Sequence, residues 1–288
     1  MGKEPGKKGE DDEVAGLWAP DPPEAARNSG ISMRKRRRRD SAEWSSILQE
    51  NTDTEEMVGC VPVSELSTVF QPIVDLRNGE AFAYEVLARC QVPGLTNPET
   101  LFKRATAERF CGLLGRTLRR IGSQGCRGIP LFLNVHPVEL GESFVIQPDD
   151  PMYGHDDDVY VEITESVPFS HYDLCSSMLT EMRDRGGVHL VVDDLGAGYS
   201  NLKRIADLQP TIVKLDRALV MDLDKHRRNQ ILVSGIVRMC VDLGARVVAE
   251  GLETWDEVLA VRDAGCHFGQ GYVMGRPVPV PETPKWDI

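Results

Sequence analysis

From about residue 61 onward, the hydrophobic residues of the chain follow two patterns that alternate. Short apolar runs typical of strands are separated by longer segments in which apolar residues recur every three or four positions, as on one helix face. We therefore predict strands at 67–76, 80–89, 130–137, 159–166, 189–196, 211–217, 245–251 and 267–275. The same reasoning predicts helices at 98–122, 172–187, 200–210, 229–244 and 254–265. Thr254 is suited to be the N-cap of the last helix.

The order of these elements predicts an α/β fold. A strand followed by a helix, repeated along the chain, implies parallel strands, since each helix returns the chain to the same end of the sheet. The repeats are numerous enough to close a modified (β/α)8 TIM-like barrel. The first two strands flank an Arg-Asn-Gly turn at 77–79, so they form a hairpin and make one barrel strand antiparallel. The alternative is an open doubly wound sheet, but no Gly-x-Gly-x-x-Gly segment follows the first strand.

The N-terminal part of the chain differs from the rest in composition. Residues 1–58 are polar and rich in glycine and proline, without a periodic apolar face, which predicts a disordered tail before a domain at 59–288. The basic run at 34–39 is either a solvated segment or a patch that binds an acidic protein, anionic lipid or nucleic acid. Met33 directly precedes this run and is an alternative start to Met1.

Composition narrows the class of protein. The chain has 288 residues, a hydrophobic fraction of 41% and a formal net charge of -12, which argues against general nucleic-acid binding. Its seven cysteines form no Cys-x-x-Cys pair, which fits a reducing compartment better than a disulfide framework or a zinc site. No apolar run approaches the roughly 20 residues of a membrane span, and no signal-peptide core is present at the N-terminus. We therefore expect a cytoplasmic location.

Polar side chains stand at the downstream end of nearly every predicted strand. In chain order these residues are Asn134, Glu162, Glu165, Asp193, Asp194, Lys214, Asp216, Glu250, Glu253 and Gln270, and the hairpin adds Gln71, Glu85 and Arg89. In a barrel the C-terminal strand ends converge on one rim, where active sites are built. We therefore expect these side chains to share one site.

The carboxylates at this rim predict a metal centre. Several carboxylates in a partly buried site repel one another and take up protons unless a cation compensates them. Hard oxygen ligands of this number suit Mg²⁺ or Mn²⁺ rather than zinc. One acidic residue at a strand end is commonly only a helix N-cap, and Lys214 alone is more simply a salt-bridge partner. The metal interpretation therefore depends on the joint alignment of Glu85, Asn134, Glu162, Asp193, Asp194 and Glu250.

A set of sequence motifs resembles a known family. The segments FQPIVDL, YEVLAR, FLNV, VEITES, VVDDLGAGYSNL, IVKLDRALV, VVAEGLET and GCHFGQGYVMGRPVP are similar, in the same order, to those of EAL-domain cyclic-di-GMP phosphodiesterases. The resemblance covers residues from about 60 to 288. It implies a modified (β/α)8 barrel with one reversed strand, a homodimer, and hydrolysis of cyclic-di-GMP to linear 5′-pGpG with two Mg²⁺ or Mn²⁺ ions.

The resemblance also implies a role for each matching residue. One metal would be held by Glu85, Asn134, Glu162 and Asp193, and the second by Asp193, Asp194 and Glu250. Lys214 and Glu250 would position and activate the attacking water, and Glu165 would support the loop after Asp193. Glu253 and Gln270 would complete the surroundings of the water and metals. The dinucleotide would be contacted by Gln71, Leu87, Arg89 and Gln270, with Arg89 on a phosphate.

The chain departs from the family pattern at a few positions. The Glu-Ala-Leu signature reads Glu85-Val86-Leu87, and Val86 faces away from Glu85 on a strand. Leu195 and Ala197 stand where phenylalanine and threonine are common in the family. Because no expected metal ligand is missing, the sequence favours an active phosphodiesterase. The alternatives are a non-catalytic cyclic-di-GMP receptor and a protein-interaction module that keeps only the fold.

Overall fold

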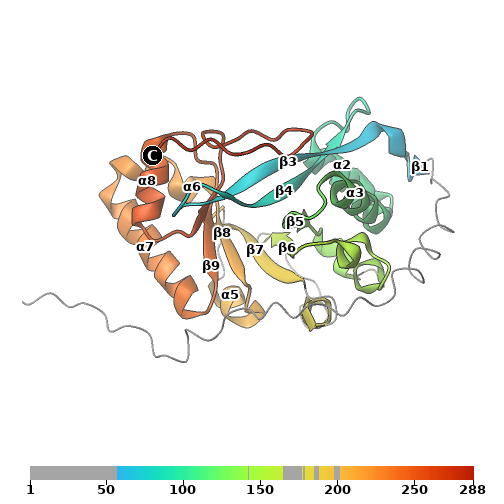
Figure 1. The fold of residues 1–288 in the computed structure, drawn as a ribbon. Helices are drawn as coiled ribbons and strands as arrows, with labels where there is room; N and C mark the ends of the chain where they lie inside the picture. The colour runs from blue at the N-terminus through green and yellow to red at the C-terminus, as the bar shows by residue number, and fades with distance from the viewer. Residues whose placement is uncertain (1–56, 142, 165–176, 178, 185–187, 198–201) are drawn as a thin grey trace, which may run out of the picture. The chain divides into compact units, whose positions relative to one another are not determined.

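The computed structural model describes residues 57–288 except 142, 165–176, 178, 185–187 and 198–201 (Figure 1). Residues 1–56 of the predicted tail, which include the basic run at 34–39, and Glu165 therefore lie outside the described residues. The last two residues of that predicted tail, Met57 and Val58, instead form a short strand. Of the predicted helix at 172–187, the described residues 177 and 179–184 are helical.

Eight strands of the described chain form a closed barrel, in the ring order β10-β3-β4-β5-β6-β7-β8-β9. They are β3 (Leu66–Asp75), β4 (Ala81–Cys90), β5 (Leu131–Asn134), β6 (Val159–Thr164), β7 (His189–Leu195), β8 (Ile212–Leu215), β9 (Arg246–Ala249) and β10 (Phe268–Gly269). Strand β3 is antiparallel to both of its neighbours, β4 and β10. The other barrel pairs are parallel. The predicted barrel with one reversed strand is therefore confirmed.

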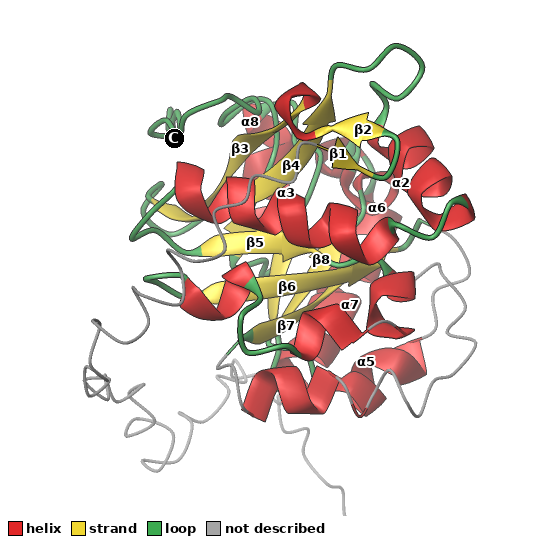
Figure 2. Ribbon diagram, turned by 90° about the vertical axis from the view of Figure 1, so that its right-hand side faces the viewer, coloured by secondary structure: helices red, strands yellow, loops and turns green. Residues whose placement is uncertain are grey.

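Helices connect the strands and cover the outside of the barrel, as Figure 2 shows for α3, α5 and α7. The α-helices whose bounds lie within the described residues are α2 (Pro98–Ala107), α3 (Cys111–Gly125), α5 (Leu202–Leu208), α6 (Arg217–Val220), α7 (Arg227–Asp242) and α8 (Trp255–Asp263). Short 3-10 turns are η2 (Val63–Glu65), η3 (Pro137–Gly141), η4 (Ser143–Ile146), η5 (Pro151–Gly154) and η6 (Leu223–Lys225). Outside the barrel, β1 (Met57–Val58) pairs with β2 (Val61–Pro62). Within the described residues, none of the helices has the length and apolar character of a membrane span.

The expected N-cap of α8 is confirmed. The Thr254 side chain accepts a hydrogen bond from the backbone N–H of Glu257, and the Glu257 carboxylate accepts one from the N–H of Thr254. This reciprocal pair is a capping box, which satisfies two backbone donors at the start of the helix.

The single helix predicted at 98–122 is wrong, because the chain forms two helices there. Arg109 has a φ of 62°, in the left-handed region that ends a helix. The N–H of Phe110 bonds the carbonyl of Ala105 at 2.9 Å, and the N–H of Arg109 bonds that of Thr106 at 3.3 Å. These two bonds form a Schellman motif, here without the glycine that normally signals one. Phe110 is thereby buried in the core beneath α2 and α3.

The last predicted strand, at 267–275, is also wrong in length, since β10 contains only Phe268 and Gly269. The chain turns after Gln270, where the N–H of Met274 bonds the carbonyl of Gly271 at 3.1 Å. A Cβ on Gly271 would lie 2.0 Å from the backbone oxygen of Leu252. Glycine at this position therefore permits a close approach of two backbones that ends the ladder.

The interior of the barrel has an apolar layer with a polar layer directly above it. Each of the eight strands contributes one side chain to the apolar layer, namely Ile73, Ala83, Phe132, Tyr160, Val191, Ile212, Val248 and Phe268. Because side chains alternate along a strand, residues two positions away also face the interior. Counted from the apolar layer, the next inward-facing residue lies two positions later in seven strands and two positions earlier in the reversed β3. These residues are Gln71, Glu85, Asn134, Glu162, Asp193, Lys214, Glu250 and Gln270. The fold thus gathers the polar strand-end residues into one ring.

The apolar layer supports this ring and should dominate the stability of the barrel. Phe132 is fully buried and stacks on Tyr160, with ring centroids 4.6 Å apart. Phe132→Ala should lower the free energy of unfolding by about 3–5 kcal/mol, because it removes buried apolar area and leaves a cavity. Urea denaturation measures this change, with Ile231→Ala on α7 as the control, since Ile231 is 60% exposed. Equal losses in the two variants would contradict this account of the core.

Candidate active site

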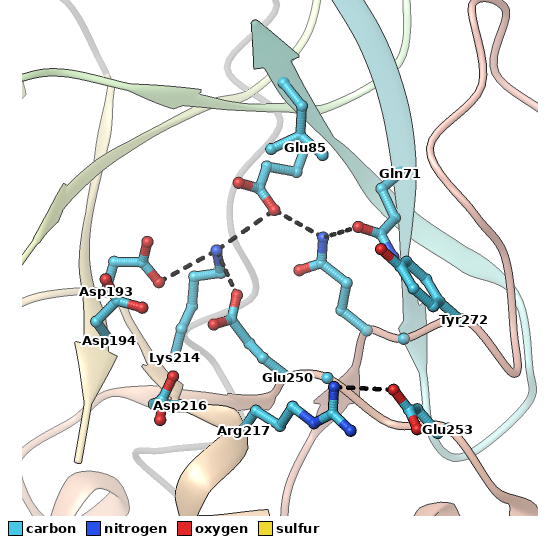
Figure 3. A pocket seen from close by; sticks show the side chains of 14 residues that line it. Gln71, Glu85, Asp193, Asp194, Lys214, Asp216, Arg217, Glu250, Glu253 and Tyr272 are labelled. Atoms are coloured by element: carbon cyan, nitrogen blue, oxygen red, sulfur yellow. Dashed lines mark hydrogen bonds and ion pairs between the residues drawn. The ribbon is translucent and has the colours of Figure 1, made fainter. Parts of the chain in front are cut away.

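Lys214 occupies the centre of the polar ring. It lies on β8, is 1% exposed, and its ammonium faces carboxylates from four other strand ends. Figure 3 shows Glu85, Asp193 and Glu250 around it. Its Nζ atom lies 2.5 Å from Glu250 Oε1, 2.6 Å from Glu162 Oε1, 3.2 Å from Asp193 Oδ1 and 3.5 Å from Glu85 Oε2. One buried cation therefore links side chains of β4, β6, β7 and the segment after β9.

Amide side chains hold the carboxylate of Glu85 from two sides. Gln270 Nε2 donates to Glu85 Oε2 at 2.7 Å, and Asn134 Nδ2 donates to Glu85 Oε1 at 3.2 Å. Gln270 Nε2 also lies 3.3 Å from Gln71 Oε1, while Gln71 Nε2 donates to the carbonyl of Gly275 at 3.1 Å. These contacts fix Glu85 in one orientation within the ring.

A bulge brings two consecutive aspartates to the same site. On a regular strand, Asp193 and Asp194 would point to opposite faces. Here the register between β7 and β8 shifts between Val192 and Leu195, and Asp194 has a φ of 59°. Aspartate tolerates this left-handed conformation better than most residues. As a result, one carboxylate oxygen each of Asp193, Asp194 and Glu250 lie within 4.8 Å of one another.

Burial and the charges of neighbouring groups shift the pKa values of Lys214 and Glu85. Burial alone would lower the pKa of Lys214, but the surrounding carboxylates outweigh it and raise this pKa well above its usual value. Burial would raise the pKa of Glu85, but the charge of Lys214 and the amide hydrogen bonds outweigh it and lower this pKa. Lys214 therefore stays an ammonium and Glu85 a carboxylate at neutral pH.

Three further carboxyl groups of the site, Glu162, Glu250 and Asp194, have raised pKa values. Burial, and next the charge of Glu85, raises the pKa of Glu162 well above its usual value. Burial also raises the pKa of Glu250, against the opposing effect of Lys214. For Asp194, burial and the neighbouring Asp193 raise the pKa to about 6. The protein alone therefore lacks enough positive charge to keep every carboxyl ionised.

The donor set of this site fits divalent cations. Five carboxyl groups, Glu85, Glu162, Asp193, Asp194 and Glu250, surround a single ammonium. Glu162 Oε2 is buried and receives no hydrogen bond from the described residues. A buried oxygen without a donor is costly unless a ligand completes it. Carboxylate and amide oxygens are the ligands that Mg²⁺, Ca²⁺ and Mn²⁺ prefer.

A pocket of about 360 Å³ opens above the ring. Gln71, Glu85, Leu87, Asp193, Asp194, Lys214, Glu250 and Gln270 line it together with Asp216, Arg217, Gly251, Glu253, Gly271 and Tyr272. Glu253 lies at the rim, where its Oε1 is 2.8 Å from Arg217 Nη1 (Figure 3). Asp216 is the N-cap of α6, because its carboxylate accepts from the N–H of Ala218 at 2.8 Å.

A second pocket, of about 700 Å³, adjoins the first and shares Glu85 and Leu87 with it. It lies between β4, α2, α3 and the segment that follows β5. Arg89 and Asn134 line this second pocket rather than the first. Arg89 Nη1 donates to the carbonyl of Ala88 at 2.8 Å. A ligand that crosses Leu87 would therefore contact both pockets.

The structure brings most of the expected site residues together and adds a few that sequence reasoning missed. Glu253 is paired with Arg217 at the rim, and Glu165 lies outside the described residues. Arg217 and Tyr272 were not expected to line the site. Each follows an expected residue closely, since Arg217 is next to Asp216 and Tyr272 comes two positions after Gln270. Closeness in sequence to an expected site residue is therefore the signal that could have identified Arg217 and Tyr272.

Comparisons with known proteins agree with the fold. Residues 62–277 match the EAL domain family. The chain is 31% identical over 231 residues to cyclic di-GMP phosphodiesterase PA2567 of Pseudomonas aeruginosa, covering 76% of this chain and 39% of that protein.

Solved structures show the same barrel. The complex of Klebsiella pneumoniae BlrP1 with calcium and cyclic di-GMP has a TM-score of 0.63 and 28% identity, over 76% of this chain and 57% of that one. The manganese and cyclic di-GMP complex of BlrP1 has a TM-score of 0.64 and 30% identity, over 74% and 56% of the two chains. This chain thus spans less than two thirds of the length of these relatives. The match over most of its own length shows that the chain belongs to the EAL domain family.

Proposed function

We propose that this protein is a phosphodiesterase that hydrolyses cyclic di-GMP to linear 5′-pGpG. The observation that carries the proposal is the ring of carboxylates around Lys214, built from rigid strand ends at the floor of a pocket. Relatives in the same family are named cyclic di-GMP phosphodiesterases, which supports this substrate.

Two Mg²⁺ or Mn²⁺ ions are the proposed cofactors. Glu85, Asn134, Glu162 and Asp193 would hold one ion, and Asp193, Asp194 and Glu250 would hold the other. When bound, such ions make water more acidic and stabilise negative charge on phosphoryl oxygens. The excess of carboxylates over ammonium groups supports this assignment, because the ions would supply the missing positive charge.

The residues of the chain would handle the proton and orient the reactants. Glu250 would accept a proton from the attacking water, whose oxygen would form a bond to phosphorus while the bond to the 3′-oxygen breaks. The leaving oxygen then takes up a proton. Lys214 lies 2.5 Å from Glu250 Oε1 and keeps its charge, so it would hold this carboxylate and the water in place. Glu165, which lies outside the described residues, is proposed to support the loop after Asp193.

The two adjoining pockets support a substrate with two nucleotide halves. We place the reacting phosphate above the ring, with Gln71, Gln270 and Leu87 beside it and Glu253 at the rim. One half of the dinucleotide would cross Leu87 into the second pocket, where Arg89 would bind its phosphate. Residues 59–288 would form this phosphodiesterase domain, and a homodimer and an anionic partner for residues 34–39 remain further proposals.

Removal of one carboxylate of the ring tests the proposed chemistry. Glu85→Gln and Asp193→Ala should each lower kcat at least about 100-fold, since even indirect metal partners cost 10- to 100-fold when removed. The measurement is chromatography of nucleotides after incubation of the purified protein with cyclic di-GMP and Mg²⁺ or Mn²⁺. Glu80→Gln is the matched control, because Glu80 is exposed beside the turn of the same hairpin.

Two outcomes would redirect the assignment. Turnover retained in Glu85→Gln would exclude Glu85 as a ligand. Tight binding of cyclic di-GMP by wild-type protein without any product would instead indicate a receptor, and would direct attention to Leu195 and Ala197 in the loop after β7.

Metal binding has a second readout that does not depend on turnover. Excess Mg²⁺ should raise the melting temperature of the wild-type protein, because a ligand at 100 times its Kd stabilises the folded state by about 2.7 kcal/mol. In Asp194→Asn the increase in melting temperature should be clearly smaller, because a neutral amide replaces one carboxylate of the proposed metal site at Asp193, Asp194 and Glu250. With chelator, Asp194→Asn should be at least as stable as wild type, because repulsion from Asp193 is removed. Equal Mg²⁺-dependent shifts in the two proteins would exclude Asp194 as a ligand.

A further inference from the structure

One aromatic residue on the wall of the second pocket has features of a recognition residue. His136 follows β5 two positions after Asn134, and its half-buried ring lines this pocket. The ring is stacked on Phe102 of α2, with centroids 5.9 Å apart and planes 10° from parallel. Contact with Phe102 limits the rotation of the imidazole, so its nitrogen atoms keep a defined direction.

The hydrogen bonds of His136 identify its tautomer. The backbone N–H of Val138 donates to His136 Nδ1 at 3.2 Å, so Nδ1 acts as an acceptor. In a neutral imidazole the other nitrogen, Nε2, then carries the hydrogen. Nε2 has no hydrogen-bond partner among the described residues, and it is not among the buried unpartnered atoms. His136 therefore presents a free N–H donor at the pocket wall.

A buried ionic cluster holds the backbone of His136 in place. The N–H of His136 donates to Glu139 Oε1 at 2.9 Å, and Glu139 Oε2 is 2.7 Å from Arg119 Nη1. Arg119 also lies 2.8 Å from Asp150 Oδ2. Arg119, Glu139 and Asp150 are at most 2% exposed, so displacement of any of them would leave a buried charge unpaired. The segment that carries His136 is thus anchored to α3.

We propose that His136 is a base-recognition residue, whose Nε2–H donates to the O6–N7 edge of a guanine held in the second pocket. This inference rests on the proposed function. Guanine presents two acceptors, O6 and N7, on this edge, whereas adenine presents an amino donor in place of O6. A fixed N–H donor that reaches O6 therefore favours guanine over adenine, whereas a donor that reaches only N7 accepts either base. His136 is assigned to binding and not to the chemical step, because it lies outside the ring around Lys214.

Equilibrium binding tests the contact at the level of single atoms. Dissociation constants are measured with Ca²⁺, the ion in a solved cyclic di-GMP complex of a relative. The ligands are cyclic di-GMP, its analogue with 7-deazaguanine bases, which lacks N7, and its analogue with 2-aminopurine bases, which lacks O6. His136→Ala should weaken binding of cyclic di-GMP between about 3-fold and 10-fold, the range for one hydrogen bond. One of the two analogues lacks the acceptor that His136 contacts. For that analogue, His136→Ala and wild-type protein should have the same dissociation constant.

Two variants separate this contact from a change in folding. His136→Gln keeps an N–H donor and should recover part of the affinity that His136→Ala loses. His226→Ala is the matched control, because His226 is exposed and lines neither pocket. It should leave all three dissociation constants unchanged.

The possible results distinguish this inference from the proposed function. Equal losses for all three ligands in His136→Ala, or no loss for any, would exclude the base contact while leaving hydrolysis by wild-type protein intact. Wild-type protein that neither binds nor hydrolyses cyclic di-GMP would overturn the proposed function and this inference with it.

Discussion

The site depends on the electrostatic pairing of one buried ammonium with carboxylates from four separate strand ends. Lys214 is 1% exposed, and its Nζ lies within 3.5 Å of Glu85, Glu162, Asp193 and Glu250. Such a cluster is costly to bury, since each ion loses water and like charges lie close together. Lys214 keeps the cluster together without neutralising it. The remaining negative charge would attract divalent cations, and the bound cations would in turn attract a phosphodiester.

The barrel can carry this unfavourable cluster because of how its strands alternate. Each strand places one apolar side chain in the packed interior and a polar one two positions away, at the rim. The apolar layer, with Phe132 stacked on Tyr160, stabilises the strands whose ends hold the charges. The apolar layer thus supplies stability and the neighbouring polar layer supplies the charged groups, both from the same strands. The bulge at Asp193 and Asp194 adds one carboxylate that regular alternation along β7 would have pointed to the other face.

Most of this arrangement is predictable from sequence because it follows from local patterns. Alternation and strand order are enough to expect a barrel with a reversed strand and polar residues on one rim. The break at Arg109 was missed because a left-handed arginine has no signal like that of glycine. The donor at His136 was missed because its tautomer and its contact with Phe102 depend on tertiary neighbours. The ion pair between Glu253 and Arg217 at the pocket rim was missed for the same reason, because it also depends on tertiary neighbours.

The most direct test of the central claim is hydrolysis of cyclic di-GMP by the purified protein in water enriched in ¹⁸O, followed by mass spectrometry. The account predicts a linear dinucleotide with a single ¹⁸O atom, located on its 5′-phosphate, because water oxygen adds to phosphorus as the 3′-oxygen leaves. Recovery of intact cyclic di-GMP from protein that binds it, or a product with ¹⁸O elsewhere than the phosphate, would contradict the account.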